Sequence, residues 1–174
     1  MYRPIVALAC VAFLTPIGAG AQESSAATAS GVSPIYYGGY VTMWFGNPFR
    51  LGAFPLVGYR VTPRLSVGVQ AGYEYLNYDG PGGAVSNYGG AVFARYRLVP
   101  QFYLHGEGRY INYGNPTTSD RVWVPFVLLG GGFVQRLGTN TSAYVEALFD
   151  VLQDDNSPYE NWDPIIRVGI AVGF

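Results

Sequence analysis

Bulky apolar residues alternate with small or polar residues along most of this chain. Residues 165–174 show the pattern most clearly. One face of this stretch carries Ile166, Val168, Ile170, Val172 and Phe174, and the other carries Arg167, Gly169, Ala171 and Gly173. A period of two predicts a β-strand between two different environments. We expect this stretch to form a strand that closes on the aromatic Phe174.

Turn residues separate further runs of this kind, which predicts eight strands in up-and-down order. The expected strands cover residues 35–45, 50–61, 65–75, 88–98, 102–113, 122–137, 142–153 and 162–174. Short turns follow the even strands and mostly longer loops follow the odd ones, as in transmembrane β-barrels. Pro55 and Pro125 fall inside strands, where each removes a hydrogen-bond donor. We expect a local bulge at both prolines.

The short turns also predict how neighbouring strands are aligned, because turn length and alternation must agree. The expected opposite pairs are Arg60 with Ser66, Gly58 with Gly68, Leu56 with Gln70 and Gly52 with Glu74 around 62–64; Arg95 with His105 around 99–101; and Val134 with Val145, Gly132 with Ala147, Phe133 with Glu146 and Leu129 with Asp150 around 138–141. These alignments place most charged side chains on one face of the sheet.

Composition suggests that the other, apolar face does not meet water. Only 12% of the residues are charged, whereas a soluble domain averages about 25%. All ten basic residues are Arg and none is Lys. No run of 18 apolar residues occurs in the body of the chain, which excludes helical membrane spans. The net charge of −1 argues against a nucleic-acid partner.

Alternation alone also fits a soluble, lipocalin-like barrel with its apolar face inward. The more polar face is built largely from small residues, which suit the interior of a narrow barrel: Gly52, Gly58, Ser66, Gly68, Gln70 and Gly72. The apolar face ends in two aromatic levels, Tyr73, Tyr75, Tyr88, Tyr110 and Phe149 near the loops and Tyr59, Tyr96, Phe102 and Phe174 near the turns. Aromatic residues gather at membrane interfaces in this way. We therefore predict an all-β fold, an eight-stranded antiparallel up-and-down transmembrane β-barrel over residues 35–174.

The beginning of the chain has the features of a targeting signal. Arg3 precedes an apolar run over residues 5–14, and Ala19, Gly20 and Ala21 form a small-residue cleavage site. We expect residues 1–21 to be a signal peptide and residues 22–34, rich in Ser, Ala, Thr and Gly, to be a disordered periplasmic leader. Cys10, the only cysteine, lies before the apolar run ends, which disfavours a lipoprotein anchor.

The inward charges are the most informative set of side chains. An eight-stranded barrel is only wide enough for its side chains to fill it, and buried charges must be paired. We expect an ion-pair network that seals the interior, with Glu107 in diagonal reach of Arg95. A gated pore or a proton path is the alternative. The network is expected to contain Arg60, Glu74, Arg95, Arg97, His105, Glu107, Arg109, Glu146, Asp150 and Arg167, with Arg50 on the same face.

No catalytic, cofactor or metal site is expected. His105 is the only histidine and has no nearby Ser to activate, so an interior structural role is favoured over that of a general base. The acidic residues Asp154, Asp155, Glu160 and Asp163 could hold a divalent cation, but a solvated loop is the simpler interpretation. Residues 130–132 are three glycines without a following helix and do not form a phosphate loop.

Several stretches resemble known barrels. Residues 55–66 (PLVGYRVTPRLS), 93–96 (FARY), 130–133 (GGGF) and 156–159 (NSPY) are similar to stretches in small, uncharacterised outer-membrane barrel proteins of Gram-negative bacteria. The architecture resembles the eight-stranded barrels of the OmpA/OmpX type. This resemblance implies a location in the bacterial outer membrane, contact with outer-membrane lipid and lipopolysaccharide, and recognition of the strand ending in Phe174 by the barrel-assembly machinery.

These features favour a non-enzymatic envelope protein, a monomer with a structural or surface-interaction role. Two alternatives remain open at this point: a small passive pore for small solutes, and an outer-membrane lipid-modifying enzyme that uses His105. A wide lumen would favour the pore, and a histidine near the outer rim would favour the enzyme.

Overall fold

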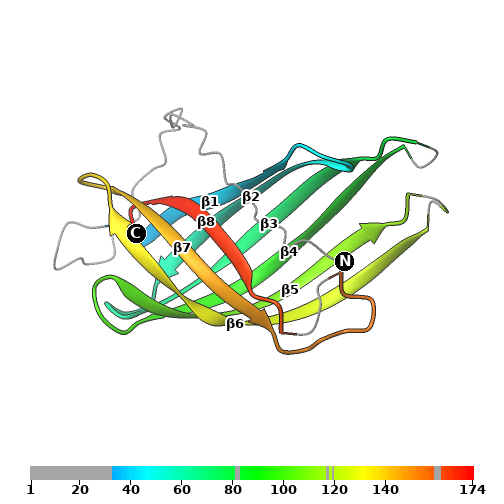
Figure 1. The fold of residues 1–174 in the computed structure, drawn as a ribbon. Coiled ribbons are helices and arrows are strands. Elements are labelled where there is room, and N and C mark those ends of the chain that lie inside the picture. Colours follow the sequence, from blue (N-terminus) through cyan, green and yellow to red (C-terminus); the bar gives the residue numbers. More distant parts are fainter. Residues whose placement is uncertain (1–32, 81–82, 117, 119, 159–161) are drawn as a thin grey trace, which may run out of the picture.

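The computed structural model describes residues 33–80, 83–116, 118, 120–158 and 162–174. Eight strands form a closed barrel in which each strand pairs antiparallel with the next and β1 pairs with β8 (Figure 1). The strands are β1 Ile35–Trp44, β2 Phe49–Arg60, β3 Leu65–Asn77, β4 Ala84–Arg97, β5 Phe102–Gly114, β6 Arg121–Arg136, β7 Thr141–Asp150 and β8 Ile165–Val172. The predicted all-β, eight-stranded, antiparallel up-and-down fold is confirmed. The expected signal peptide and most of the leader lie outside the described residues.

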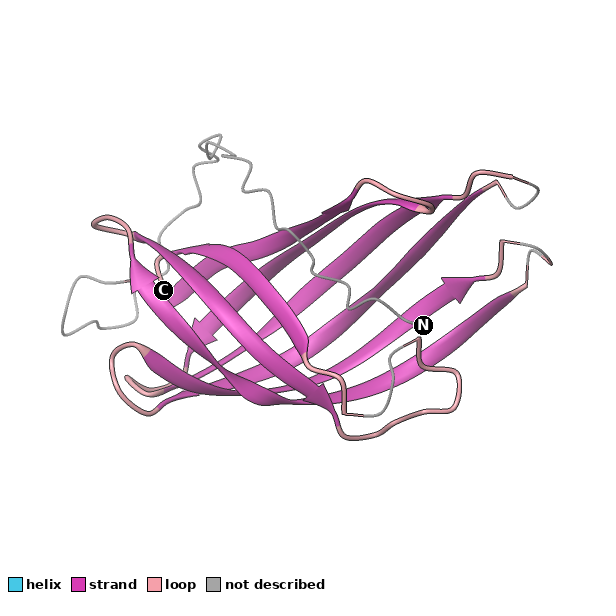
Figure 2. Cartoon of the chain, in the orientation of Figure 1, coloured by secondary structure: helices cyan, strands magenta, loops and turns pink. Residues whose placement is uncertain are grey.

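The structure contains strands, turns and loops in its described part (Figure 2). No helix among these residues is long and apolar enough to cross a membrane. The strands differ modestly from expectation: β3 and β4 reach further toward the loop between them, whereas β7 ends at Asp150 and β8 begins at Ile165.

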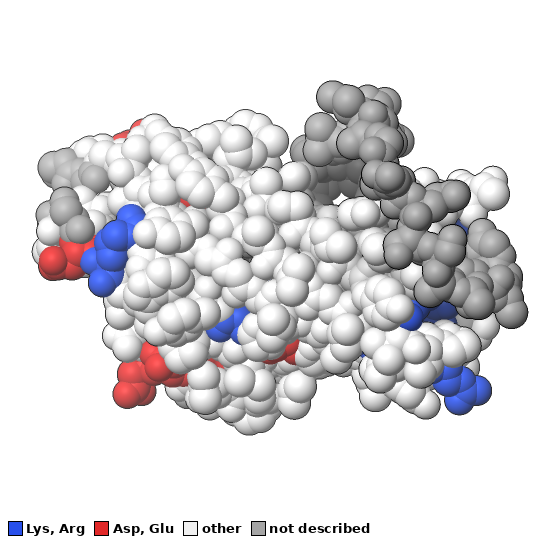
Figure 3. Space-filling view, turned by 180° about the vertical axis from the view of Figure 1, so that it is seen from behind, with Lys and Arg blue, Asp and Glu red and all other residues white. Residues whose placement is uncertain are grey.

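Alternation along the strands separates an interior from an outer wall. In β2, Gly52, Phe54 and Leu56 are buried, whereas Leu51 and Val57, at the alternate positions, are exposed. The same pattern recurs around the barrel, so large apolar side chains cover the outside. Seen from behind, this wall is mostly white, and most of its few blue and red side chains lie toward the two ends (Figure 3).

The three short turns have the same hydrogen-bond pattern. Leu65 O accepts from Val61 N and Thr62 N, and Phe102 O accepts from Leu98 N and Val99 N. Thr141 O accepts in the same way from the amides at 137 and 138. The predicted alignments of β2 with β3 and of β4 with β5 are confirmed, including Arg60 opposite Ser66 and Arg95 opposite His105.

The predicted alignment of β6 with β7 is wrong by one residue. Phe133 lies opposite Val145, Gly132 opposite Glu146 and Leu128 opposite Asp150. The expectation assumed a turn over 138–141, whereas the actual turn leaves three residues between Leu137 and Thr141. Around Gly130 the sequence of β6 offers no alternation that would have excluded the slip. As a result Val134 and Leu128 point inward, and Phe133 and Leu129 belong to the outer wall.

The bulges expected at the two prolines are also absent. Tyr110 pairs with Pro125 inside an unbroken β5–β6 register, and Gly39 pairs with Pro55. Between β2 and β3 the ladder skips Phe54 and Pro55 and resumes at Leu56 without a shift. A proline removes one donor but does not require an extra residue. The carbonyl of Phe54 accepts from Gln70 Nε2 at 3.5 Å.

Interior aromatic rings lie over glycines on the neighbouring strand. A Cβ built on Gly58 would come within 2.0 Å of the Tyr36 ring, and one on Gly132 within 2.4 Å of the Tyr103 ring. The same relation joins Phe93 with Gly68, Tyr144 with Gly169 and Phe54 with Gly72. The absence of a side chain on one strand therefore makes room for a ring from the next, and the narrow interior is filled in this way.

Candidate functional site

The interior is divided into layers along the barrel axis. An aliphatic and aromatic cluster formed by Ile111, Val124, Phe126, Leu128 and Leu148 lies toward the loop end. Aromatic residues including Tyr36, Tyr103 and Tyr144 lie toward the turn end. Between them is a layer of buried charges, which we call the central network: Arg95, His105, Glu107, Arg109, Glu146 and Arg167.

Glu146 of β7 anchors the turn-side half of the central network. Arg95 of β4 reaches across the lumen and places Nη2 at 2.6 Å from Glu146 Oε1. Tyr103 Oη donates to the same oxygen at 2.8 Å. Both partners of the ion pair are almost fully buried, with 3% and 1% of their side-chain surface exposed. The pair joins strands that are not neighbours in the sheet.

Glu107 of β5 anchors the other half. Arg167 of β8 binds both of its carboxylate oxygens, through Nη1 at 2.8 Å and Nη2 at 3.2 Å. Arg109, two residues further along β5, donates from Nε to Glu107 Oε1 at 2.7 Å. Two guanidinium groups therefore share one buried carboxylate, and the two-pronged contact with Arg167 is the strong form of this interaction.

His105 connects the two halves. Its Nε2 lies 3.1 Å from Glu107 Oε2, and its Nδ1 lies 3.1 Å from both Arg95 Nε and Glu146 Oε1. A ring that carries its proton on Nε2 donates to Glu107 and accepts from Arg95. Phe93 stacks on the imidazole with ring centroids 5.6 Å apart.

Arg109 extends the network to two further strands. Its Nη2 donates to Gln70 Oε1 at 2.7 Å and to Tyr40 Oη at 3.1 Å. Tyr40, Gln70 and Tyr103 were not among the residues expected in the network. Alternation already placed Gln70 and Tyr103 on the inward face, so a search of that face for neutral donors and acceptors would have found them.

Four of the expected members lie elsewhere. Arg60 and Arg97 lie at the turn end without a carboxylate partner among the described residues. Glu74 pairs with Arg50 near the loop end, at 3.6 Å. Asp150 accepts from the backbone amides of Val127 and Leu152. The expected approach of Glu107 to Arg95 does not occur, because Arg95 turns to Glu146 on the far wall.

Phe174 does not belong to the outer aromatic level where it was expected. Gly173 has a φ of +80°, which interrupts the alternation and turns the last side chain inward. The Phe174 ring meets Tyr36 edge-on at 4.9 Å and Tyr103 at 5.8 Å between centroids. Tyr59, Tyr96 and Phe102 do face outward near the turns, as expected.

The central network engages both nitrogens of His105. Its side chain is almost fully buried, and no serine hydroxyl among the described residues is bonded to it. In the ranges that the structure describes, no group of three His, Cys, Asp or Glu residues could hold a metal ion. Asp154 of the last loop accepts from Asn156, and Glu160 lies outside the described residues.

The chain matches no known protein-family model, and no curated protein matches it. The inference about function therefore rests on the arrangement of these residues. The central network contains buried, mutually paired charges from β4, β5, β7 and β8, with Arg109 reaching β1 and β3. Chemically, such a layer can hold opposite walls of the barrel together and oppose the passage of solutes.

Proposed function

We propose that this protein is a non-enzymatic β-barrel of the bacterial outer membrane, with a structural or surface-interaction role and a sealed interior. The central network is the observation that carries the proposal. Arg95 with Glu146 and Arg167 with Glu107 cross the lumen at distances of 2.6 to 2.8 Å, and their side chains are at most 3% exposed. Ions and solutes would have to break these pairs in order to pass.

The outer wall supports a membrane location. Four aliphatic side chains near the middle of the wall are about half exposed: Val69 (56%), Val92 (64%), Leu104 (51%) and Leu129 (49%). The outward positions next to them on the same strands carry no charged side chain. Apolar patches of this extent are unfavourable in water and mark contact with lipid or another apolar surface. In this proposal outer-membrane lipid surrounds the wall and lipopolysaccharide surrounds the loop end.

Targeting, membrane insertion and oligomeric state follow from the same proposal. Residues 1–21 act as a signal peptide, and the barrel-assembly machinery inserts the protein by recognising the strand that ends at Phe174. The folded protein is a monomer that needs no cofactor and has no nucleic-acid partner. The four loops at the end opposite the short turns are presented to the cell exterior, where they carry any surface interaction.

Conductance measurements test the sealed interior. The purified barrel is reconstituted in planar bilayers and in liposomes for a swelling assay, with a known porin as the positive control. We expect silent bilayers and no swelling with small sugars, because the charged layer fills the cross-section. Steady single-channel currents in the wild type that change in Glu107→Gln would show that the network gates a pore, and would refute the sealed barrel.

A further inference from the structure

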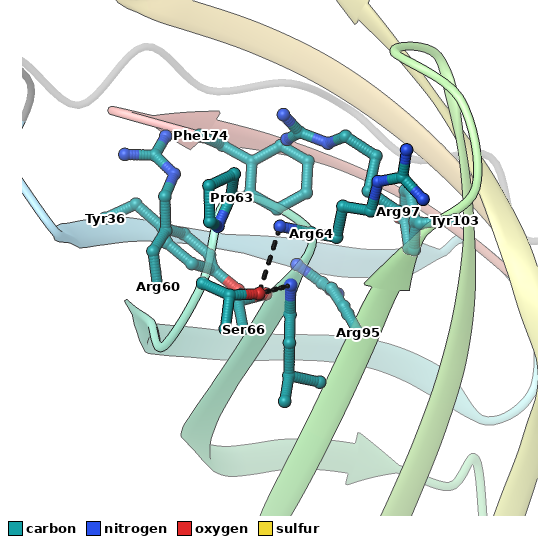
Figure 4. Close-up of a pocket in the computed structure, with 11 residues that line it drawn as sticks. Tyr36, Arg60, Pro63, Arg64, Ser66, Arg95, Arg97, Tyr103 and Phe174 are labelled. Carbon is teal, nitrogen blue, oxygen red and sulfur yellow. Dashed lines mark hydrogen bonds between the residues drawn. The ribbon is translucent and has the colours of Figure 1, made fainter.

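The turn end of the barrel has a small cup whose lining is rich in arginine. Arg60, Arg64, Arg95 and Arg97 line it, together with the hydroxyl-bearing residues Thr62 and Ser66, and its lining contains no Asp or Glu side chain (Figure 4). Phe174 and Tyr36 provide apolar walls. The cup is partly open to solvent, and its cavity volume is about 10 Å³.

The arginines of this cup have unused donors. The side chains of Arg64 and Arg97 have no hydrogen-bond acceptor in the described ranges, and Arg97 lies only over the Phe174 ring, at 5.1 Å from its centroid. Arg95 is 3% exposed, and although its Nε and Nη2 are bonded, its Nη1 has no partner. Arg60 is partly used, since it donates to the carbonyls of Ser33 and Gly173.

Charge is also distributed unequally between the two ends. Arg136 is a fifth arginine at the turn end and lies close enough to Arg97 to repel it electrostatically. The acidic residues outside the central network all belong to the loop end within the described ranges: Glu74, Asp79, Asp120, Asp150, Asp154, Asp155 and Asp163. On the face drawn in Figure 3, the right-hand end shows blue side chains and no red ones. The turn end therefore attracts anions, and the repulsion among its arginines is relieved when one binds.

We propose that the turn-end cup binds a phosphate group. Guanidinium groups match the oxygens of phosphate through paired hydrogen bonds, and several can serve one tetrahedral anion. A volume of about 10 Å³ admits one oxygen-sized atom. One phosphate oxygen enters the cup toward Arg95 Nη1, and the remaining oxygens stay at the mouth, where Arg64 and Arg97 donate to them. The phosphate belongs either to a lipid headgroup beside the turn end or to a soluble ion.

The binding site does not depend on the proposed membrane location, so it is tested first in detergent. Inorganic phosphate is titrated by calorimetry into the full-length barrel folded in a non-ionic detergent that carries no phosphate, with chloride at equal ionic strength and acetate as comparisons. We expect saturable phosphate binding and weaker or no acetate binding, because a carboxylate presents two oxygens rather than three or four. Phosphate binding no stronger than that of chloride would overturn the proposal.

Matched variants separate a site from general electrostatic attraction. Arg64→Gln and Arg97→Gln remove donors from the cup, whereas Arg136→Gln removes the same charge at the same end without touching the cup. Loss of a charged hydrogen-bond partner predicts roughly tenfold weaker phosphate binding in the first two and a small change in Arg136→Gln. Equal losses in all three, with folding verified by gel mobility, would refute a defined site.

Lipid nanodiscs identify the source of the phosphate. The same titration is repeated in discs of phosphatidylglycerol and of digalactosyldiacylglycerol, whose headgroup carries no phosphate. If a lipid phosphate occupies the cup, added phosphate binds in the galactolipid discs but not in phosphatidylglycerol. If the ligand is soluble phosphate, binding is equal in both. Either result supports the site. The sealed barrel is tested separately by conductance, so failure of the phosphate site and failure of the sealed barrel are distinguishable.

Discussion

Glu107 pairs with more arginine side chains than Glu146, the other carboxylate of the central network. It accepts from Arg109, from both terminal nitrogens of Arg167 and from His105, and its side chain is 1% exposed. A carboxylate in this position is stable only because its partners surround it. If it is removed, two guanidinium groups remain buried without their counterion, which is more costly than the loss of the pair itself.

Glu107→Ala is therefore expected to lower the free energy of unfolding by about 3–5 kcal/mol. Glu107→Gln keeps one acceptor oxygen and the shape of the side chain, so its effect should be smaller. The measurement is urea unfolding of the lipid-reconstituted barrel, followed by tryptophan fluorescence. Glu74→Ala is the control, since its pair with Arg50 is 3.6 Å long and the Arg50 side chain is 36% exposed; a loss of about 1 kcal/mol or less is expected there. Equal losses at the two positions would contradict the central role of Glu107.

Gly132 provides a second test at the scale of single residues. A Cβ at Gly132 would come within 2.4 Å of the Tyr103 ring, and Tyr103 is held by its hydrogen bond to Glu146. Gly132→Ala is expected to destabilise the barrel by about 1–3 kcal/mol, the range typical of overpacking. At Gly108, on the outward face of β5, the nearest atom is Val92 Cγ2 at 3.9 Å. Gly108→Ala should be neutral in the same unfolding assay, and a comparable loss there would show that ring packing is not the cause.

At the scale of the strand, β8 closes the barrel and its end turns into the interior. Only three residue pairs join it to β1: Tyr37 with Val172, Gly38 with Ala171, and Gly39 with Ile170. Directly beyond this short seam, Phe174 packs against Tyr36 of β1 and Tyr103 of β5. The ring therefore supports closure by side-chain contacts where the ladder of backbone hydrogen bonds is short.

Phe174→Asp is expected to lower the amount of folded protein in the outer membrane of expressing cells. The change removes the aromatic contacts at the seam and, on the resemblance to outer-membrane barrels, the residue that the assembly machinery recognises. Immunoblots of membrane fractions, run with and without boiling, measure the folded amount. Phe102→Asp is a matched control, because Phe102 is an outward aromatic near the same end and 53% exposed. Wild-type levels of Phe174→Asp would contradict a role for this residue in assembly.

At the scale of the whole molecule, the closed sheet and the apolar wall determine how the protein behaves outside a membrane. Each strand pairs on both sides, so the barrel has no free edge over its paired length. Backbone groups in a closed barrel are satisfied within the sheet, which is what an apolar solvent requires. In water, however, the wall would expose the large apolar side chains that cover it, which is unfavourable.

The purified protein is therefore expected to need detergent and to run with altered mobility on unheated gels, because the closed sheet resists unfolding by the detergent until it is boiled. Size-exclusion chromatography and paired heated and unheated samples measure both properties. A soluble, monodisperse protein without detergent would contradict the membrane-inserted barrel. It would favour the soluble, lipocalin-like alternative, although the interior charges at Arg95 and Glu146 would then need another explanation.

The period-two pattern and the short turns determined which segments became strands, which face points inward, and how β2 aligns with β3 and β4 with β5. These are local properties, since side chains alternate along any strand and a three-residue turn sets the neighbouring register. The same reasoning failed at β6, where Leu128, Leu129 and the glycines after them do not alternate and only the turn length could decide. It also placed Phe174 on the wrong face, because alternation ends at the positive φ of Gly173.

Sequence alone indicated that inward Arg and Glu side chains must find partners, because an unpaired buried charge is too costly in a narrow interior. Only the tertiary structure decided the pairing. Arg95 meets Glu146 and Arg167 meets Glu107 across the lumen, between strands that are not adjacent in the sheet. Which side chains face each other there depends on the curvature and stagger with which the sheet closes. That closure is a property of all eight strands together, and no local pattern contains it.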